Sequence, residues 1–151
     1  MNQLLTKKKK KMRKINEIIV HCSDTPAGED FTVKDIDNWH KQRGWSGIGY
    51  HYVVYRDGTV HEGRSIDKAG AHCLGHNANS IGICYIGGRS QRGEPTRYYD
   101  TRTDAQKEGL LGLIKALKIK YPSIKSVVGH CDYDKGKSCP CFDAKSEYKN
   151  V

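Results

Sequence analysis

Two histidines at the ends of apolar runs constrain this chain more than any other feature. His21 follows Ile18-Ile19-Val20, and His130 follows Val127-Val128-Gly129. Apolar runs of this kind predict buried strands, so each imidazole is expected at the edge of a sheet. Cys139 lies after a stretch rich in Gly, Lys and Asp, which can turn the chain back toward that edge. Two imidazoles and a thiolate are typical zinc ligands, so the sequence predicts a zinc site.

The size of this ligand set indicates a catalytic metal. Three protein ligands leave one tetrahedral position of Zn²⁺ open, whereas structural sites are closed by four. Two neutral imidazoles and one thiolate leave a net charge of about +1, so a water in the open position is acidified less than at an all-histidine site, where its pKa is about 7. Other side chains are therefore expected to assist. Lys137, two residues before Cys139, is a candidate for stabilising oxyanion charge, although most loop lysines are simply solvated.

A second metal arrangement uses neighbouring thiols. His130, Cys131, Cys139 and Cys141 together could form a structural zinc knot. That arrangement leaves His21 without a role, and Phe142 directly after Cys141 indicates inward packing at this point. We therefore favour His21, His130 and Cys139 as ligands of one Zn²⁺ per chain.

The positive charge of the chain is concentrated at its N-terminus. Residues 1–14 contain seven of the nine net positive charges, including Lys7 to Lys11, and no acidic residue. The remaining 137 residues carry a net charge of +2. Nucleic-acid-binding domains are normally basic across the domain itself, so no nucleic-acid partner is expected. We predict a basic, disordered tail at 1–14 and a single domain at 15–151, with Met12 as an alternative start.

The hydropathy pattern predicts neither a signal peptide nor a membrane span. Residues 15–21 are too short and too polar for the apolar region of about 7–15 residues that follows the basic start of a signal peptide. No run approaches the roughly 20 apolar residues that cross a bilayer, so no membrane insertion is expected. Cytoplasmic accumulation is expected, with the six cysteines reduced and available to a metal.

Strand signals occur at several points along the chain. Strands are predicted at 15–21, at 80–86, where the run is apolar enough for a central strand covered on both faces, and at 126–129. Residues 50–62 predict a hairpin around a two-residue Asp57-Gly58 turn. Loops are predicted at 23–30 and 88–102.

Helical signals alternate with these strands. One helix is predicted from the capping box Thr32-x-x-Asp35 to about Gly44, and a longer one from Thr103 to Pro122. The tail after Asp143 predicts one or two further helical turns. Strands interleaved with helices indicate an α/β fold, with a central mixed sheet flanked by helices.

The remaining histidines have less distinctive positions. His72, in the Gly-rich stretch 70–77, is a candidate for substrate contact, and His76 is a weaker one. His40 is expected to pack beside Trp39, and His61 is expected to face solvent. His51 points to the opposite sheet face from Tyr50, because neighbouring strand residues alternate.

Several ordered motifs together resemble one family. The motifs are His21-Cys-Ser-Asp-Thr, Gly44-Trp-x-x-x-Gly-Tyr-His-Tyr, Arg56-Asp-Gly-Thr-Val, Gly63-Arg64, Gly70-Ala-His, Asn77-x-Asn-Ser-Ile-Gly-Ile, Gly129-His-x-Asp, Lys137-Ser-Cys-Pro and Phe142-Asp. In this order and over residues 15–144, the chain resembles the zinc-dependent N-acetylmuramoyl-L-alanine amidases of the phage-lysozyme and peptidoglycan-recognition family.

The resemblance implies both a site and an activity. It implies that His21, His130 and Cys139 bind zinc in a surface groove of the mixed sheet and that Tyr50 and Lys137 are catalytic. The activity implied is metal-assisted hydrolysis of the amide between N-acetylmuramic acid and L-alanine in peptidoglycan. A phage or prophage endolysin that reaches the wall after release fits a chain without a signal peptide. A cytosolic enzyme that recycles wall fragments is the less favoured reading.

Two other classes of function stay open at this point. A peptidoglycan-binding module without activity could share the fold, but it would not need the complete set of three ligands. A zinc-stabilised nucleic-acid binder that uses the lysine tail is the more distant alternative, and its binding would weaken as salt rises. For the amidase, a monomer is expected.

Overall fold

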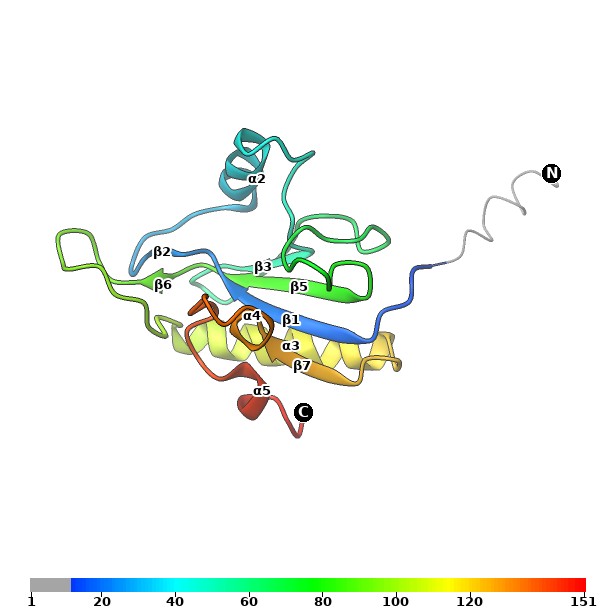
Figure 1. Ribbon diagram of the computed structural model, residues 1–151. Helices are drawn as coiled ribbons and strands as arrows, with labels where there is room; N and C mark the ends of the chain where they lie inside the picture. Colours follow the sequence, from blue (N-terminus) through cyan, green and yellow to red (C-terminus); the bar gives the residue numbers. More distant parts are fainter. Residues whose placement is uncertain (1–11) are drawn as a thin grey trace.

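A mixed β-sheet of five strands forms the centre of the structure, a computed structural model that describes residues 12–151 (Figure 1). The strand order is β4-β3-β5-β1-β7. The strands are β1 (Glu17–Cys22), β3 (Tyr52–Val54), β4 (Val60–Glu62), β5 (Ser80–Tyr85) and β7 (Ser126–Gly129). Strands β3, β5, β1 and β7 run parallel to one another, and β4 pairs antiparallel with β3 at one edge. The predicted α/β class is confirmed.

Four helices accompany the sheet in the described part of the chain. They are α2 (Val33–Gln42), α3 (Asp104–Lys120), α4 (His130–Tyr133) and α5 (Ala144–Glu147). None of those in residues 12–151 is long and apolar enough to cross a bilayer. Both predicted helix starts are confirmed, because Thr32 and Thr103 each close a capping box with the residue three positions later.

The two faces of the sheet have different coverings. Helix α3 packs along one face, where Leu110 and Ile114 join the core with Ile18 and Val20 of β1 (Figure 1). Helix α2 stands beyond the other face, with Ile36 packed near Val53. Side chains alternate along a strand, so His21, which is two residues from Ile19, points away from α3. The chemistry of His21 is thus placed on the face that α3 leaves open.

The central strand matches its prediction. All six residues of β5 are buried, and β5 lies between β3 and β1. Continuous burial explains why this segment shows no apolar and polar alternation.

Two segments predicted as loops contain short strands. Strands β2 (Thr25–Pro26) and β6 (Gly88–Arg89) form a separate parallel pair. Two-residue strands carry no periodic signal, so the sequence could not reveal them.

The hairpin turn is one residue longer than predicted. The amide of Tyr55 donates to the carbonyl of Thr59, and the amide of Gly58 donates back to Tyr55. Gly58 has a φ of +86°, so it takes the left-handed position at the end of a three-residue loop. The predicted two-residue Asp57-Gly58 turn is therefore wrong, although the glycine is the reason for the turn in both cases.

The folded body begins before residue 15. Arg13 donates to the carbonyls of Ile66, Ala78 and Ser80, at 2.9, 3.1 and 2.8 Å. The guanidinium thus attaches the segment before β1 to the loop before β5 and to the first residue of β5. The predicted tail extended to Lys14, so it included this residue. Residues 1–11 of that tail lie outside the described residues.

Candidate metal centre

Strand register brings the two predicted histidine ligands together. Strands β1 and β7 are parallel neighbours, and Val20 pairs with Gly129. His21 and His130 are the residues that directly follow this pair, so both lie at the same edge of the sheet. Their ring centroids lie 4.6 Å apart.

A closed loop returns Cys139 to the same edge. The amide of Cys131 donates to the carbonyl of Cys139 at 2.8 Å, which closes the loop that begins with α4. At the next residue, the Tyr85 hydroxyl donates to the Pro140 carbonyl at 2.6 Å. The Cys139 sulfur accepts a hydrogen bond of 3.1 Å from the Cys22 amide.

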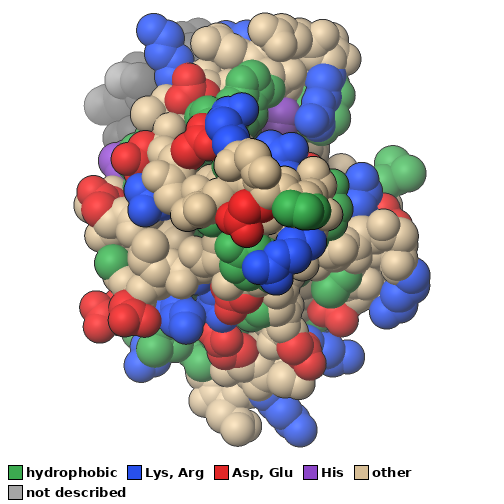
Figure 2. All heavy atoms as spheres, turned by 90° about the vertical axis from the view of Figure 1, so that its left-hand side faces the viewer, with side chains coloured by type: hydrophobic (Ala, Val, Ile, Leu, Met, Phe, Trp, Pro, Cys, Tyr) green, Lys and Arg blue, Asp and Glu red, His purple; other side chains and the backbone are tan. Residues whose placement is uncertain are grey.

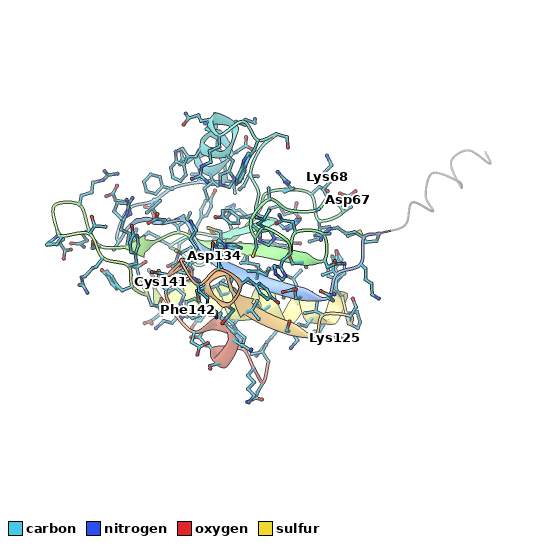
Figure 3. The ribbon with its side chains drawn as sticks, in the orientation of Figure 1. Asp67, Lys68, Lys125, Asp134, Cys141 and Phe142 are labelled. Carbon is cyan, nitrogen blue, oxygen red and sulfur yellow. The ribbon has the colours of Figure 1, made fainter. Side chains whose placement is uncertain are left out.

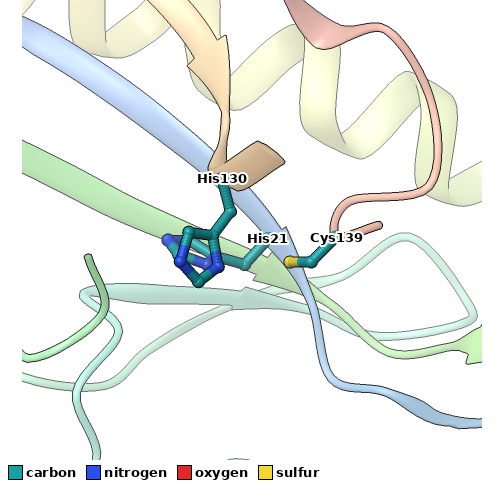
Figure 4. Close-up of side chains that lie close together, drawn as sticks. All are labelled: His21, His130 and Cys139. Carbon is teal, nitrogen blue, oxygen red and sulfur yellow. The ribbon is translucent and has the colours of Figure 1, made fainter. Parts of the chain in front are cut away.

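The three predicted ligands form one cluster (Figure 4). Their donor atoms all lie within 4.8 Å of one another, and within residues 12–151 this is the group of His, Cys, Asp or Glu side chains whose geometry could hold a metal ion. The alternative zinc knot needs Cys131 and Cys141 as well, and the structure does not bring them into this group.

Burial keeps the imidazoles neutral. His21 is almost completely buried, and desolvation holds its pKa well below the ordinary value, with the nearby His72 and His130 lowering it further. Desolvation also lowers the pKa of the His130 imidazole. Neutral imidazoles have a free nitrogen lone pair, which is the form that binds metal.

Tyr50 stands beside this cluster. It immediately precedes the buried His51, and its ring centroid lies 5.1 Å from that of His21 and 5.5 Å from that of His40. Desolvation, with smaller contributions from Cys84 and Cys139, raises the pKa of the Tyr50 phenol well above its usual value. The hydroxyl therefore stays protonated and available as a donor.

Lys137 approaches from the loop that carries Cys139. The loop turns at Asp134, whose carbonyl accepts from the Lys137 amide at 3.0 Å and whose carboxylate accepts from the Gly136 amide at 3.1 Å. In Figure 3, Asp134 and Cys141 lie near α4, and Lys125 lies at the other end of β7. Lys137 is an exposed side chain on the wall of the groove described next.

The cluster opens into a groove of about 750 Å³. One wall comes from α2 and the residues after it, including Trp39, His40 and Trp45, and the other from the loop around Lys137. Tyr50 and His130 line the groove between them. This volume lies within the range of about 300–1,000 Å³ that is usual for ligand-binding sites.

His72 lies deeper than expected for a substrate contact. It borders the groove, but it is only 9% exposed. Its Nδ1 is 2.8 Å from Nε2 of His21, and its Nε2 is 3.2 Å from the Ser80 hydroxyl. Both ring nitrogens are thus engaged within the protein, and the predicted substrate contact stays a prediction.

The other histidines have structural partners. His40 is buried and accepts from the Gly49 amide at 2.8 Å, which agrees with the packing role predicted for it. His51 is also buried, and its Nδ1 accepts from the Gly82 amide at 3.1 Å. His61 and His76 stack on tyrosine rings. The ring centroids of His61 and Tyr55 lie 3.7 Å apart, and those of His76 and Tyr133 lie 3.6 Å apart. His61 is partly exposed beside the Tyr55 ring.

Cys141 packs away from the cluster. Its sulfur lies 3.9 Å from that of Cys22 and 3.4 Å from the Gly88 carbonyl. Inward packing at this point was predicted from Phe142, whose ring is 3.4 Å from the Arg102 guanidinium.

Sequence reasoning missed Ser80 as part of the site. This serine opens β5, is fully buried and bonds to His72. The sequence feature that could have indicated a role for Ser80 is the motif Asn77-x-Asn-Ser-Ile-Gly, in which a polar residue starts an otherwise apolar strand.

Comparison with known proteins gives a consistent result. Residues 11–142 match the model of the N-acetylmuramoyl-L-alanine amidase family, Amidase_2. The endolysin of Klebsiella phage KP32 is 40% identical over 135 residues, which cover 89% of this chain and 86% of the relative. The endolysin of Enterobacteria phage T3 is 42% identical over 130 residues, which cover 85% and 82%.

A solved structure has the same fold. The N-acetylmuramoyl-L-alanine amidase LysC from Clostridium intestinale URNW superposes with a TM-score of 0.74 at 32% sequence identity. The superposition covers 90% of this chain and 83% of that chain.

Proposed function

This chain belongs to the N-acetylmuramoyl-L-alanine amidase family and is a peptidoglycan amidase of the endolysin type, and from this premise we propose that its active site is one zinc ion held by His21, His130 and Cys139. The bond cleaved joins N-acetylmuramic acid to L-alanine. The observation that carries the proposal is the meeting of these three donors within 4.8 Å of one another beside the groove, which His130 and Cys139 line.

The donor set fits zinc on chemical grounds. Imidazole nitrogen and thiolate sulfur suit Zn²⁺, whereas Mg²⁺ and Ca²⁺ prefer oxygen ligands. In a tetrahedral site with zinc bonds of about 2.0–2.3 Å, the donor atoms lie about 3.3–3.8 Å apart, so donors within 4.8 Å need to move by about an ångström to close the site. The Cys22 amide directed at the Cys139 sulfur is the kind of contact that a ligating thiolate accepts.

A zinc ion held there would polarise the amide carbonyl and make a water nucleophilic near neutral pH. The protein itself supplies the remaining functions. The Lys137 ammonium stabilises the negative charge that develops on the carbonyl oxygen. The Tyr50 phenol, kept protonated by burial, donates a hydrogen bond that orients the attacked group, and either side chain can pass a proton to the leaving amine.

The groove is suited to a glycopeptide. Trp39, Trp45 and Tyr98 provide aromatic faces in its lining, and Arg43, which lies 5.6 Å from the centre of the Trp45 ring, adds a positive charge. Aromatic faces stack on sugar rings, and an arginine pairs with carboxylates such as those of a stem peptide. We expect a monomer to be sufficient, because all of these residues come from one chain. As for other endolysins, the enzyme would act on the wall after its release from the cytoplasm.

The proposal is tested on purified peptidoglycan. The zinc-loaded protein should release new L-alanine amino termini and no reducing sugar ends. A strong chelator should abolish the release, and added Zn²⁺ should restore it, whereas Mg²⁺ should not. Undiminished release after verified removal of all metal would overturn the metal-dependent mechanism.

A further inference from the structure

A chain of hydrogen bonds runs from His21 into the protein interior. Nε2 of His21 lies 2.8 Å from Nδ1 of His72. Nε2 of His72 lies 3.2 Å from the Ser80 hydroxyl, which lies 2.7 Å from the backbone carbonyl of His76. The three side chains joined by these hydrogen bonds, those of His21, His72 and Ser80, are all buried.

The direction of these hydrogen bonds follows from the carbonyl at the inner end. A carbonyl oxygen only accepts, so the Ser80 hydroxyl donates its single proton to His76. Ser80 must then accept from His72, which places the His72 proton on Nε2 and leaves a lone pair on Nδ1. A neutral imidazole has one N–H, so His21 must donate from its own Nε2.

This direction selects one tautomer of His21. With its proton on Nε2, the ring has a free lone pair on Nδ1, the nitrogen that is not used by His72. The opposite tautomer would set two lone pairs against each other across 2.8 Å. We propose that His72 and Ser80 are positioning residues that hold His21 in the Nε2–H tautomer and so present Nδ1 to the metal.

The His72 ring is fixed in a slot made by two glycines. A Cβ on Gly82 would lie 2.5 Å from the Cδ2 atom of His72, and a Cβ on Gly70 would lie 2.4 Å from the same atom. The backbone of His72 is held as well, because the Asn77 side-chain oxygen accepts from the amides of His72 and Cys73 at 2.9 and 3.0 Å. Both the ring and its backbone are therefore preset before any ligand binds.

His51, which lies next to His72, takes no part in these hydrogen bonds. The His51 ring centroid is 6.0 Å from that of His72. Nδ1 of His51 accepts from the Gly82 amide, so its proton is on Nε2, which lies 2.8 Å from the Lys68 carbonyl and 3.1 Å from the Arg13 guanidinium. Both ring nitrogens of His51 thus have partners other than His72.

The inference rests on the proposed zinc site, but its first test needs no metal. In the metal-free protein labelled with ¹⁵N, long-range ¹H–¹⁵N correlation spectra distinguish the protonated from the unprotonated ring nitrogen. At pH 7.5 we expect the proton of His21 on Nε2, and also that of His72. A proton on Nδ1 of His21 in the wild-type protein would overturn the proposal.

The second test measures zinc affinity by competition with a chromophoric chelator. Partners of ligating histidines typically contribute 10–100-fold to metal affinity, so Ser80→Ala and His72→Phe should weaken zinc binding by about that factor. His72→Asn keeps an oxygen acceptor near the position of Nδ1 and should recover part of the loss. The ¹⁵N spectrum of Ser80→Ala should also show His21 in a mixture of tautomers.

Ser90→Ala is the matched control. Ser90 is also buried, and its hydroxyl donates to the Pro95 carbonyl at 3.0 Å, away from the groove. This variant should bind zinc as the wild type does. Equal zinc affinity in Ser80→Ala, His72→Phe and Ser90→Ala would overturn the positioning role. Failure of the wild type to bind zinc would instead overturn the proposed metal centre. The NMR measurement would still show whether His72 and Ser80 fix the tautomer of His21.

Discussion

Tyr50 and Lys137 line the same groove in environments of opposite character. The Tyr50 ring is packed against the His21 and His40 rings, and burial keeps its phenol protonated. Lys137 extends from an exposed loop. Neither side chain belongs to the group of metal donors, so each can be removed without taking away a ligand.

The first prediction separates catalysis from metal binding. Tyr50→Phe and Lys137→Ala should each lower kcat by about 10²–10³-fold, as is usual for a proton-transfer group or an oxyanion donor, and both should keep the wild-type zinc content. Lys135→Ala removes an exposed lysine from the same loop and should leave kcat unchanged. Loss of zinc from Tyr50→Phe would mean that this residue supports the ligands.

Individual residues differed in how far the sequence revealed them. His21 and His130 were identified because each ends an apolar run, and parallel strands bring such ends together. The bond between His72 and His21 was not visible, because it joins residues 51 positions apart through a loop without periodicity. Sequence could mark His72 as unusual but not show which partner it meets.

At the scale of elements, the fit between β7 and the loop that returns Cys139 sets the position of the sulfur. Gly129 ends β7, and a Cβ there would lie 2.7 Å from Cδ of Pro140. Pro140 has little freedom to move, because its carbonyl accepts from the buried Tyr85 hydroxyl. Any side chain at position 129 therefore pushes on the residue next to Cys139.

The second prediction follows from this contact. Gly129→Ala should displace Pro140 and weaken zinc binding by about tenfold or more, because ligands must be held within a few tenths of an ångström. Gly112→Ala is the matched control: it lies in α3, and nothing is within 4 Å of the added Cβ. This control should keep its zinc affinity and gain up to about 1 kcal/mol in unfolding free energy. Equal zinc affinity in the two variants would contradict the prediction.

The elements that the sequence predicted are those with a strong local signal. Helices α2 and α3 begin at capping boxes, and the continuous apolar run of β5 indicated a central strand. Strands β2 and β6 exist only because they pair with each other, and α4 is a single turn after β7. Pairing and short turns depend on tertiary contacts, so local patterns do not predict them.

At the scale of the whole molecule, the buried histidines make stability depend on pH. Burial lowers the pKa of His40 and of His51 to about 4, with the charges of nearby arginines adding to the effect. In the unfolded chain both titrate near 6.5. Below pH 6.5 the unfolded state therefore binds protons that the folded state does not, so stability is complete above pH 6.5 and is lost as the pH falls toward 4.

The third prediction is a slope within this window. In the metal-free protein, His40 and His51 should each make the free energy of unfolding fall by up to about 1.4 kcal/mol per pH unit between pH 6 and 5, measured by urea denaturation. The lowered pKa values of His21 and His72 add to this slope. The lowered pKa values of Asp100 and Glu147 affect stability only at lower pH. His40→Asn should reduce the slope by up to about 1.4 kcal/mol per pH unit, the contribution of one histidine. A free energy that does not change between pH 7 and 5 would contradict the account.

Charge is also distributed unevenly over the whole molecule. On the face shown in Figure 2, acidic and basic side chains are interspersed, which agrees with the small net charge of the body. Lys7 to Lys11 contribute five of the nine net positive charges of the chain. Bacterial envelopes are polyanionic, and a cationic segment binds such surfaces with an affinity that falls as salt rises.

The fourth prediction concerns this segment. Removal of residues 1–11 should leave kcat/KM on a small soluble muropeptide unchanged. On intact cell walls at low ionic strength, the full-length protein should be faster. The difference should disappear at a few hundred millimolar salt, where the Debye length lies between about 8 and 3 Å. Equal rates on intact walls at low salt would show that the segment has no role in attachment.

The central claim is that Cys139, and not the nearby Cys141, completes a metal site with His21 and His130. Its most direct test is the zinc content per chain of Cys139→Ser and Cys141→Ser, measured by mass spectrometry on protein dialysed against trace zinc. We predict one zinc ion per chain in the wild type and in Cys141→Ser, and none in Cys139→Ser. Full zinc content in Cys139→Ser together with its loss in Cys141→Ser would contradict the account.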